Sequence, residues 1–342
     1  MSASTRLLVA DAASGLFLDR VRKSPAAAGF EITAPGDESE EALCAAAREA
    51  EVILCYKARL PGPAIRAASS LKLIQKHGLN CKNIDLAAAS ERGVAVATQP
   101  LLRNATVAEQ ALALMLACAR KLVPGHRAVA EAAYLGLGLE PIRTSQWQFR
   151  SNWARIEGVT ELFGSTAGIV GLGDIGMEVA RRCRAFGMEV AYHQRTPHSK
   201  EVEDTYEARY LPLDELLAAA DYLVLVLPHT PESEGLIGPS QLARMKPTAT
   251  LINVGRGALV DEEALVRALR EGRIAMAGLD VYRWEPLPES SPLRALPNVV
   301  LLPHTGGGSD RSWGVDVPAS LENIRRFFRG EPPRGLIRPG RA

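Results

Sequence analysis

Cysteine is scarce in this chain, and its spacing matches no common metal site or disulfide scaffold. Zinc sites and disulfide frameworks both need paired cysteines at short, regular spacings. The 342 residues include an odd number of scattered cysteines and no C-x-x-C pair: Cys44, Cys55, Cys81, Cys118 and Cys183. We therefore expect free thiols and a reducing, cytoplasmic setting.

Long apolar runs and an excess of one charge are also lacking. The most apolar stretch, residues 111–119, is far shorter than the roughly 18 residues that a membrane helix needs. The run Leu7–Ala10 is too brief for the core of a signal peptide. Lys and Arg number 40 against 39 Asp and Glu, whereas a nucleic-acid binder needs a basic surface that displaces counterions. The composition argues against membrane-spanning and nucleic-acid-binding proteins and favours a globular protein of about two domains.

The chain does contain two series in which short apolar runs alternate with helical patterns. In the first series, runs at 6–10, 51–55, 71–75 and 94–97 predict strands, and helical spacing occupies 41–50 and 84–92. A second series extends from Thr166 to Pro303. Strands that alternate with helices pair in parallel and form doubly wound sheets. We predict an α/β protein with two doubly wound parallel-sheet domains.

Two longer helices and an irregular stretch complete the predicted elements. A helix over 104–121, with Asn104 as its N-cap, has one apolar face: Val107, Ala111, Leu114, Met115 and Cys118. A basic helix over 319–330 directs Ile324, Phe327 and Phe328 inward. The periodicity fades over 136–158, which predicts a connecting lobe.

A glycine fingerprint opens the second series. The apolar run Thr166–Val170 is followed directly by G-x-G-x-x-G, with Gly171, Gly173 and Gly176, and then by a helical pattern whose apolar positions are Ile175, Val179, Cys183 and Phe186. The glycines permit a tight turn, a close approach to pyrophosphate and close helix–strand packing, and the helix N-terminus offers N–H groups to the phosphate. A strand before it and a helix after it indicate a dinucleotide site.

The next predicted strand, 188–192, leads to the residues that discriminate between NAD and NADP. An acidic side chain about 20 residues beyond the glycines binds the ribose 2′-OH and repels a 2′-phosphate. Here Gln194 occupies that position and Arg195 follows it. A neutral side chain beside a guanidinium favours NADP(H) over NAD(H), unless Arg195 is only a solvated loop charge.

Polar and glycine residues follow the other strands of the second series. They are Pro228–Thr230, Gly255–Gly257, Asp280 and Pro303–Gly307. Because ligands of open parallel sheets bind outside the carboxyl ends of the strands, we expect these residues to meet at one edge.

Three of these side chains suit acid–base chemistry on an anionic substrate. Arg256, between two glycines, offers a bidentate grip on a carboxylate. His304 can exchange a proton near neutral pH, and Glu285 can hydrogen-bond and orient its imidazole. Each also has an ordinary interpretation: a turn charge, a capping histidine and a surface carboxylate. His126, His193 and His198 are interpreted as loop or surface positions.

With these residues in place, the chain resembles the D-isomer-specific 2-hydroxyacid dehydrogenase family along nearly its whole length. The matching stretches are 78–86, 106–115, 163–187, 227–230, 252–265, 278–288 and 303–304. The resemblance implies a flavodoxin-like outer domain (1–103 plus 305–342), a Rossmann domain (104–304) and a cleft between them. It also implies a homodimer formed through the nucleotide domain, with 136–158 in the contact.

The resemblance also implies the roles of individual residues. Arg256, Glu285 and His304 match the catalytic residues, and Gly78, Leu79, Arg256 and Lys57 are the substrate-binding candidates. The cofactor-binding candidates are Thr106, Gly171, Gly173, Asp174, Ile175, Gly176, Gln194, Arg195, Thr196, Leu227, Pro228, Val254, Gly255 and Asp280. The chain departs from the family at Asn80, where G-x-G is common, and at Gln194-Arg195.

The expected activity is NAD(P)H-dependent reduction of a small 2-keto acid, glyoxylate or hydroxypyruvate first, to the D-2-hydroxy acid. Hydride transfer from a nicotinamide needs no metal. Lys57 and Arg59 follow an outer-domain strand and either face the substrate or are solvated. Two cations facing the substrate would suit a doubly anionic or phosphorylated acid such as 3-phosphoglycerate. Two alternatives stay open: a formate- or phosphite-type dehydrogenase, and a nucleotide-sensing corepressor-like scaffold. Glu285 argues against the formate type, whose members have Gln at this position.

Overall fold

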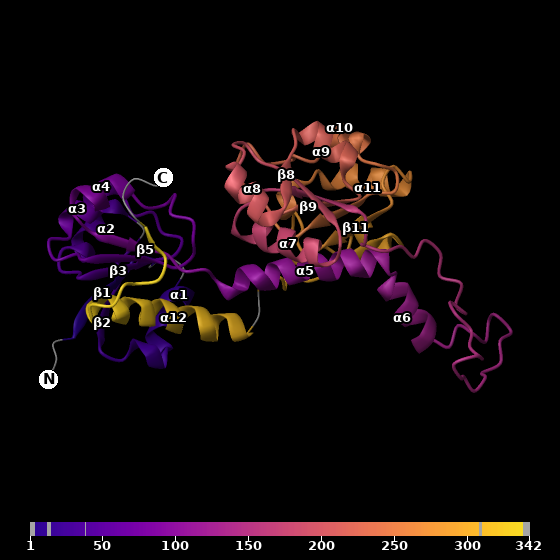
Figure 1. Cartoon of the computed structure of the whole chain (residues 1–342), viewed down its shortest axis with the longest axis horizontal. Coiled ribbons are helices and arrows are strands. Elements are labelled where there is room, and N and C mark those ends of the chain that lie inside the picture. Colours follow the sequence, from indigo (N-terminus) through magenta and orange to yellow (C-terminus); the bar gives the residue numbers. More distant parts are fainter. Residues whose placement is uncertain (1–3, 12–14, 38, 308–309, 338–342) are drawn as a thin grey trace. The chain divides into compact units, whose positions relative to one another are not determined.

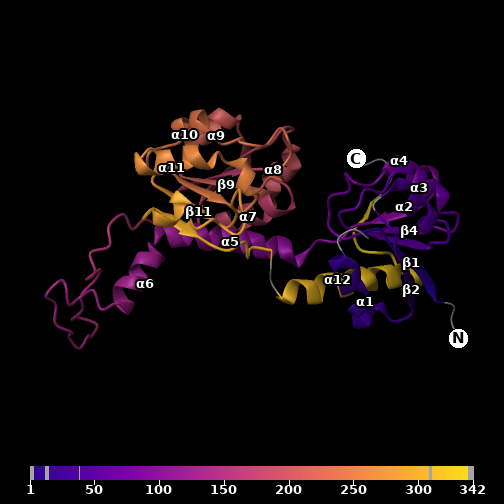
Figure 2. The ribbon, with the colours of Figure 1, turned by 180° about the vertical axis from the view of Figure 1, so that it is seen from behind.

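The computed structural model describes residues 4–11, 15–37, 39–307 and 310–337. The chain divides into two compact units (Figures 1 and 2): residues 1–104 with 309–342, and residues 105–308. We call them the discontinuous unit and the central unit. Within the described ranges, no helix combines the length and apolar character that crossing a membrane requires.

The discontinuous unit is built on a six-stranded sheet with strand order β13-β5-β4-β3-β1-β2. Its strands are β1 (Thr5–Val9), β2 (Phe30–Thr33), β3 (Val52–Cys55), β4 (Leu73–Lys76), β5 (Ala95–Ala97) and β13 (Leu336–Ile337). The first five are parallel, and β13 adds an antiparallel edge beside β5. This is the flavodoxin-like order, in which the direction of winding reverses between β1 and β3.

Helices cover both faces of this sheet because its strands present apolar residues to both sides. One core packs under α2 (Glu40–Ala47), α3 (Gly62–Ala67) and α4 (Leu86–Glu91). The other packs under α1 (Leu16–Lys23) and α12 (Asp310–Phe328), which lie side by side in Figures 1 and 2. The C-terminal helix thus completes a core begun by the first strands of the chain.

The central unit holds a seven-stranded parallel sheet, ordered β12-β11-β10-β9-β6-β7-β8. Its strands are β6 (Thr166–Val170), β7 (Glu189–His193), β8 (Ala208–Tyr210), β9 (Tyr222–Leu225), β10 (Thr250–Asn253), β11 (Met276–Leu279) and β12 (Val299–Leu301). The order reverses between β6 and β9, as in a Rossmann fold. The predicted α/β fold class with two parallel-sheet domains is confirmed.

Two apolar cores lie on the two faces of the central sheet. One contains buried residues of α5 (Leu102–Ala119) and α7 (Asp174–Ala185). The other contains residues of α9 (Leu213–Ala219), α10 (Pro239–Arg244) and α11 (Glu262–Arg270). The remaining helices are α6 (Leu122–Ala130), which has no buried residue, and α8 (Lys200–Tyr206). The apolar face predicted for α5 is buried at all of its positions: Val107, Ala111, Leu114, Met115 and Cys118.

The start of α5 differs from the prediction. The helix begins at Leu102 rather than after Asn104, because a residue distant in sequence binds its first N–H groups. The carboxylate of Asp316, on α12, accepts the N–H of Leu102 at 2.8 Å and that of Arg103 at 3.5 Å. Burial raises the pKa of Asp316, although these hydrogen bonds and the Arg103 charge oppose the increase. A cap supplied by a residue 214 positions away leaves no local sequence signal.

Other predicted boundaries and elements also differ from those in the structure. The basic helix starts at 310 rather than 319 and continues through Pro318, since Val317, Leu321 and Ile324 form one buried face across the proline. Phe186, predicted on the buried face of α7, is 43% exposed because the helix ends one residue earlier. The edge strand β2 was not predicted, because partly buried and exposed residues alternate along it. The structure also places residues 305–307 in the central unit.

One buried histidine in the discontinuous unit leads to a prediction about acid stability. His77 is 1% exposed, its Nδ1 lies 2.8 Å from Ser320 Oγ, and Nε2 has no partner. Burial, with the nearby charges of Arg103 and Lys76, lowers its pKa from 6.5 to about 3. When the pH falls below the ordinary histidine pKa of 6.5, the unfolded chain therefore binds a proton at His77 that the folded chain does not bind. The free energy of unfolding then falls as the pH decreases, by up to about 1.4 kcal/mol per pH unit.

This expectation is tested by urea unfolding, followed by circular dichroism, at about pH 7 and about pH 5. His77→Asn keeps a polar partner for Ser320 but cannot take up the proton. Its stability should depend less steeply on pH than that of the wild type. Equal slopes for the two proteins would contradict this assignment.

Candidate active site

The glycine loop between β6 and α7 has the geometry of a phosphate cradle. Gly171 has a φ of 102°, which favours glycine, and nothing lies within 4 Å of a Cβ built on Gly173. A Cβ on Gly176 would lie 2.1 Å from the Gly171 carbonyl oxygen, so the helix can pack this closely only with glycine there. The open side at Gly173 and the N-terminus of the twelve-residue helix α7 fit the pyrophosphate of a dinucleotide.

The other predicted cofactor residues follow neighbouring strands of the same sheet. Leu227 and Pro228 come after β9, Val254 and Gly255 after β10, and Asp280 directly after β11. Because β6, β9, β10 and β11 are parallel neighbours, these residues lie at one edge, as predicted. Thr106 lies on α5, and Asp174 and Ile175 open α7.

The loop after β7 is closed on itself. The Gln194 side-chain amide donates to the carbonyl oxygen of Thr196 at 2.7 Å. Arg195, between them, is exposed. The position that a ribose-binding carboxylate usually occupies is therefore neutral, and an exposed guanidinium follows it.

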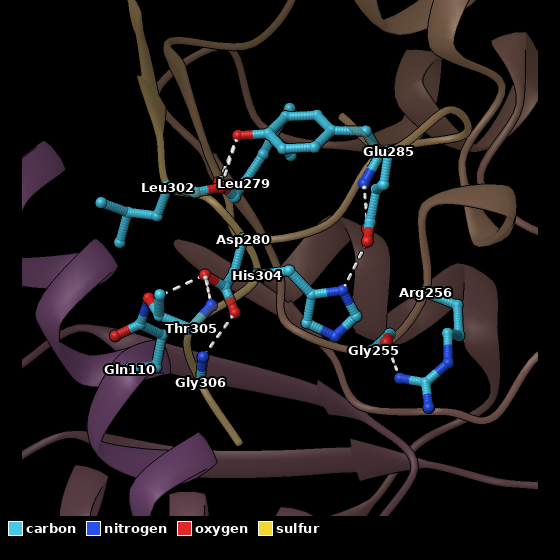
Figure 3. A network of polar contacts seen from close by, with 11 residues as sticks. Gln110, Gly255, Arg256, Leu279, Asp280, Glu285, Leu302, His304, Thr305 and Gly306 are labelled. Carbon is cyan, nitrogen blue, oxygen red and sulfur yellow. Dashed lines mark hydrogen bonds and ion pairs between the residues drawn. The ribbon is translucent and has the colours of Figure 1, made fainter. Parts of the chain in front are cut away.

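Asp280 is almost fully buried and holds the segment that follows His304 (Figure 3). Its Oδ1 accepts the N–H of Thr305 at 3.0 Å and the side-chain amide of Gln110 at 2.8 Å, and its Oδ2 accepts the N–H of Gly306 at 2.9 Å. These bonds fix the backbone directly after His304, whose own φ is 56°. Gln110, which also donates to Thr305 Oγ1, was not predicted as a site residue although it lies in a stretch that resembles the family.

His304 and Glu285 form a hydrogen-bonded pair. The Nδ1 of His304 lies 2.6 Å from Glu285 Oε2, and Glu285 Oε1 accepts the N–H of Tyr282 at 3.1 Å. Burial acts to raise the pKa of Glu285, but these hydrogen bonds and the charges of His304 and Arg256 outweigh it and lower the pKa below 4.5. An ionised Glu285 only accepts, so Nδ1 is the donor and Nε2 is left for a reacting group.

Arg256 lies on the loop after β10, next to this pair (Figure 3). A Cβ on Gly257 would fall 1.9 Å from the carbonyl carbon of Tyr282, so only glycine lets the two loops pack together. The guanidinium is exposed, and its Nη1 donates to the Gly255 carbonyl at 2.5 Å, which leaves the other N–H groups for an anion. The central unit thus brings together an imidazole, its carboxylate partner and an exposed guanidinium.

A cavity of about 570 Å³ adjoins the histidine–glutamate pair. Its lining is mainly apolar apart from this pair and Arg294, and comprises Tyr282, Glu285, Pro286, Leu287, Arg294, Leu301, Leu302, Pro303 and His304. The cavity thus gives this partly exposed carboxylate–imidazole pair an apolar wall on one side.

The substrate-binding candidates of the discontinuous unit follow its central strands. Gly78, two residues after β4, has a φ of 119°, and Leu79 is 43% exposed. Asn80, at the family's second glycine position, accepts the N–H of Lys82 on Oδ1 at 2.9 Å. This side-chain turn stabilises the loop without the glycine.

Lys57 lies on a second ordered loop, after β3. The buried carboxylate of Asp11 accepts the N–H groups of Tyr56, Lys57 and Ala58 at 2.5–2.8 Å. The Lys57 ammonium lies 5.4 Å from the Tyr56 ring centroid. Lys76 donates to the Tyr56 carbonyl, and Arg103 donates to the Tyr56 hydroxyl. The sequence analysis missed Lys76 and Arg103, because they come close to Tyr56 only in the folded unit: Lys76 through the pairing of β3 with β4, and Arg103 from the first turn of α5.

Comparisons with known proteins agree with this geometry. Residues 112–306, more than half of the chain, match the family model described as "D-isomer specific 2-hydroxyacid dehydrogenase, NAD binding domain". The chain belongs to the D-isomer-specific 2-hydroxyacid dehydrogenase family. The family resemblance and the predicted class, an NAD(P)-dependent oxidoreductase acting on 2-hydroxy acids, are confirmed.

Individual members of the dehydrogenase family match over most of their length. A glyoxylate/hydroxypyruvate reductase B from Pectobacterium carotovorum is 41% identical over 81% of this chain and 80% of its own. A glyoxylate reductase from Thermococcus onnurineus is 38% identical over 90% of each chain. The solved structure of an NADPH-dependent glyoxylate/hydroxypyruvate reductase from Sinorhizobium meliloti, in complex with NADP and malonate, superimposes with a TM-score of 0.62 at 29% identity, covering 98% of this chain and 97% of that one.

Proposed function

We propose that this dehydrogenase reduces a small 2-keto acid, glyoxylate or hydroxypyruvate first, to the D-2-hydroxy acid, reversibly. The observation that carries the proposal is the 2.6 Å contact between His304 and Glu285 with Arg256 on the adjacent loop. This set can bind a carboxylate and protonate a carbonyl oxygen. The substrate class follows from the relatives, several of which are named for glyoxylate or hydroxypyruvate reduction.

The proposed roles follow from the donors each residue offers. Arg256 binds the substrate carboxylate with the N–H groups not used by Gly255, and the backbone N–H groups of Gly78 and Leu79 bind the same group. His304 holds a proton on Nε2 and transfers it to the carbonyl oxygen at C2. Glu285 accepts the Nδ1 proton and keeps the imidazole oriented. A bound nicotinamide cofactor supplies the hydride.

NADP(H) is the proposed cofactor in preference to NAD(H). The pyrophosphate binds at the loop of Gly171 and Gly173, and the 2′-phosphate binds Arg195. The support for this preference is the neutral Gln194, whose amide is bound within its own loop, and the exposed Arg195 beside it. An NADPH-dependent relative at 29% identity is consistent with it.

We also assign roles to the two units. The central unit is the dinucleotide-binding domain, and the discontinuous unit supplies substrate contacts through the Gly78 loop and Lys57. Homodimer formation is proposed through α6 and the irregular residues after it, because this region exposes large apolar side chains: Leu122, Val129, Leu135, Trp147 and Phe149. A cytoplasmic location stays a prediction.

A spectrophotometric assay of NADPH and NADH oxidation with a panel of 2-keto acids tests the proposal. We expect turnover with glyoxylate and hydroxypyruvate, and a higher kcat/KM with NADPH. Arg195→Gln should raise the KM for NADPH by about tenfold and leave that for NADH nearly unchanged, since NADH lacks the 2′-phosphate.

Each possible failure has a distinct meaning. No oxidation with any keto acid would overturn the reductase proposal and leave a formate- or phosphite-type reaction or a nucleotide-sensing role to be tested. A higher kcat/KM with NADH would overturn the assignment of Arg195. A preference for 2-keto acids with a second anionic group would identify Lys57 as part of the substrate site.

A further inference from the structure

His198, interpreted from the sequence as a surface histidine, is bonded to the glycine loop. Its Nε2 lies 2.7 Å from the carbonyl oxygen of Leu172, the residue between Gly171 and Gly173. A carbonyl oxygen only accepts, so Nε2 carries a proton and donates it. The side chain is partly buried, and its ring lies 5.9 Å from that of Tyr192.

The position of His198 is itself fixed by hydrogen bonds. Its backbone N–H donates to the Tyr192 hydroxyl at 2.8 Å, and that hydroxyl donates to Glu203 Oε1 at 2.9 Å. Tyr192 lies on β7 and is fully buried, and Glu203 lies on α8. The backbone of His198 is therefore held in place, and its imidazole extends from there to Leu172.

Three successive residues of the glycine loop are held in this way. The N–H of Gly171 donates to the His193 carbonyl at 2.8 Å, the carbonyl of Leu172 accepts from His198, and the carbonyl of Gly173 accepts the N–H of Met177 at 2.8 Å. His193 and His198 flank the loop of Gln194, Arg195 and Thr196. The loop that discriminates the cofactor is thus tied at both ends to the loop that binds its pyrophosphate.

We propose that His198 is a positioning residue for the dinucleotide: its imidazole N–H holds the Leu172 carbonyl and so keeps the glycine loop in the conformation that binds pyrophosphate. The proposal rests on the proposed function only in assigning that loop to pyrophosphate. Because NADPH and NADH both contain pyrophosphate, His198 contributes to the binding of both. Arg195, in contrast, distinguishes between them.

The test is the Kd of NADPH and of NADH, measured by calorimetry on the full-length protein and three variants. His198→Leu removes the donor, and His198→Gln places an amide N–H near the position of Nε2. His193→Gln is the matched control, because the His193 side chain bonds to Leu211 O at 3.0 Å, away from the glycine loop, and its carbonyl remains. Circular dichroism and thermal unfolding establish that each variant is folded.

We expect His198→Leu to weaken the binding of both cofactors about tenfold, the usual effect of losing a partly buried hydrogen bond. His198→Gln should restore most of the affinity, and His193→Gln should bind within about twofold of the wild type. At saturating cofactor, His198→Leu should keep its kcat while the KM for cofactor rises, a separation that a general loss of stability would not produce.

Two results would overturn the proposal. The first is wild-type affinity in a folded His198→Leu variant. The second is a loss in His198→Gln as large as that in His198→Leu, because the donated hydrogen bond would then not be the cause. A failure of the proposed NADPH preference is a separate result: the wild type would then bind NADPH no more tightly than NADH. His198 does not set that ratio of Kd values.

Discussion

His304→Ala is expected to lower kcat by about two to four orders of magnitude while the Kd of NADPH changes little. The imidazole is the group proposed to protonate the carbonyl oxygen, and its removal leaves only water to do so. Its Nδ1 lies 2.6 Å from Glu285 Oε2, and among the described residues it has no hydrogen bond to the glycine loop or to the Gln194–Thr196 loop. Steady-state kinetics together with calorimetric titration of NADPH separate the two effects.

The pH dependence of the wild type provides a second check on this pair. The pKa of Glu285 is lowered, so its carboxylate is present above that pKa and is lost only as the pH falls below 4.5. The carboxylate of Glu285 should therefore remain available to accept the Nδ1 proton of His304 through the mildly acidic range, and Glu285→Gln should remove this carboxylate at every pH. A kcat in His304→Ala within about fivefold of the wild type would contradict the catalytic assignment.

Arg256→Leu is expected to lower kcat/KM for the keto acid by about two to three orders of magnitude, mainly through KM. Breaking a desolvated pair between a guanidinium and a carboxylate costs about 2–5 kcal/mol. Arg256→Lys should recover only part of the loss, since an ammonium keeps the charge but not the planar fork. The Kd of NADPH should stay close to that of the wild type in both variants.

Arg294→Lys is a suitable control for Arg256, because Arg294 lines the cavity beside the histidine–glutamate pair but extends from a short 3-10 helix, Pro292–Ala295. It should change kcat/KM by less than about threefold. An Arg256→Leu variant that reduces keto acids with an unchanged KM would show that another group binds the carboxylate.

The sequence signals that predict the candidate site of the central unit are local. The glycines at 171, 173 and 176 directly follow an apolar strand, and Arg256 and Asp280 each follow the end of another strand. In a parallel sheet, that local fact already determines which edge they share. The signal for His304, a histidine just after the last predicted strand, is also local. Its contact with Glu285 joins two residues that are 19 positions apart in the sequence.

What the sequence could not show are the contacts made by residues distant along the chain. The cap of α5 comes from Asp316 on α12, and the clamp on the backbone after His304 comes from Gln110 and Asp280. His198 looked like a loop residue because its partner, a backbone carbonyl 26 positions earlier, leaves no trace in side-chain type.

The sequence by itself therefore determined the fold class and, through its resemblance in several motifs, the enzyme family, and it predicted a dinucleotide loop and catalytic candidates. The fold class depends on hydrophobic periodicity, and the candidates depend on residue types at strand ends, which are properties of short segments. The tertiary structure alone decided where helices begin and which histidine holds the glycine loop. Such features depend on hydrogen bonds between segments that become neighbours only when the sheets assemble.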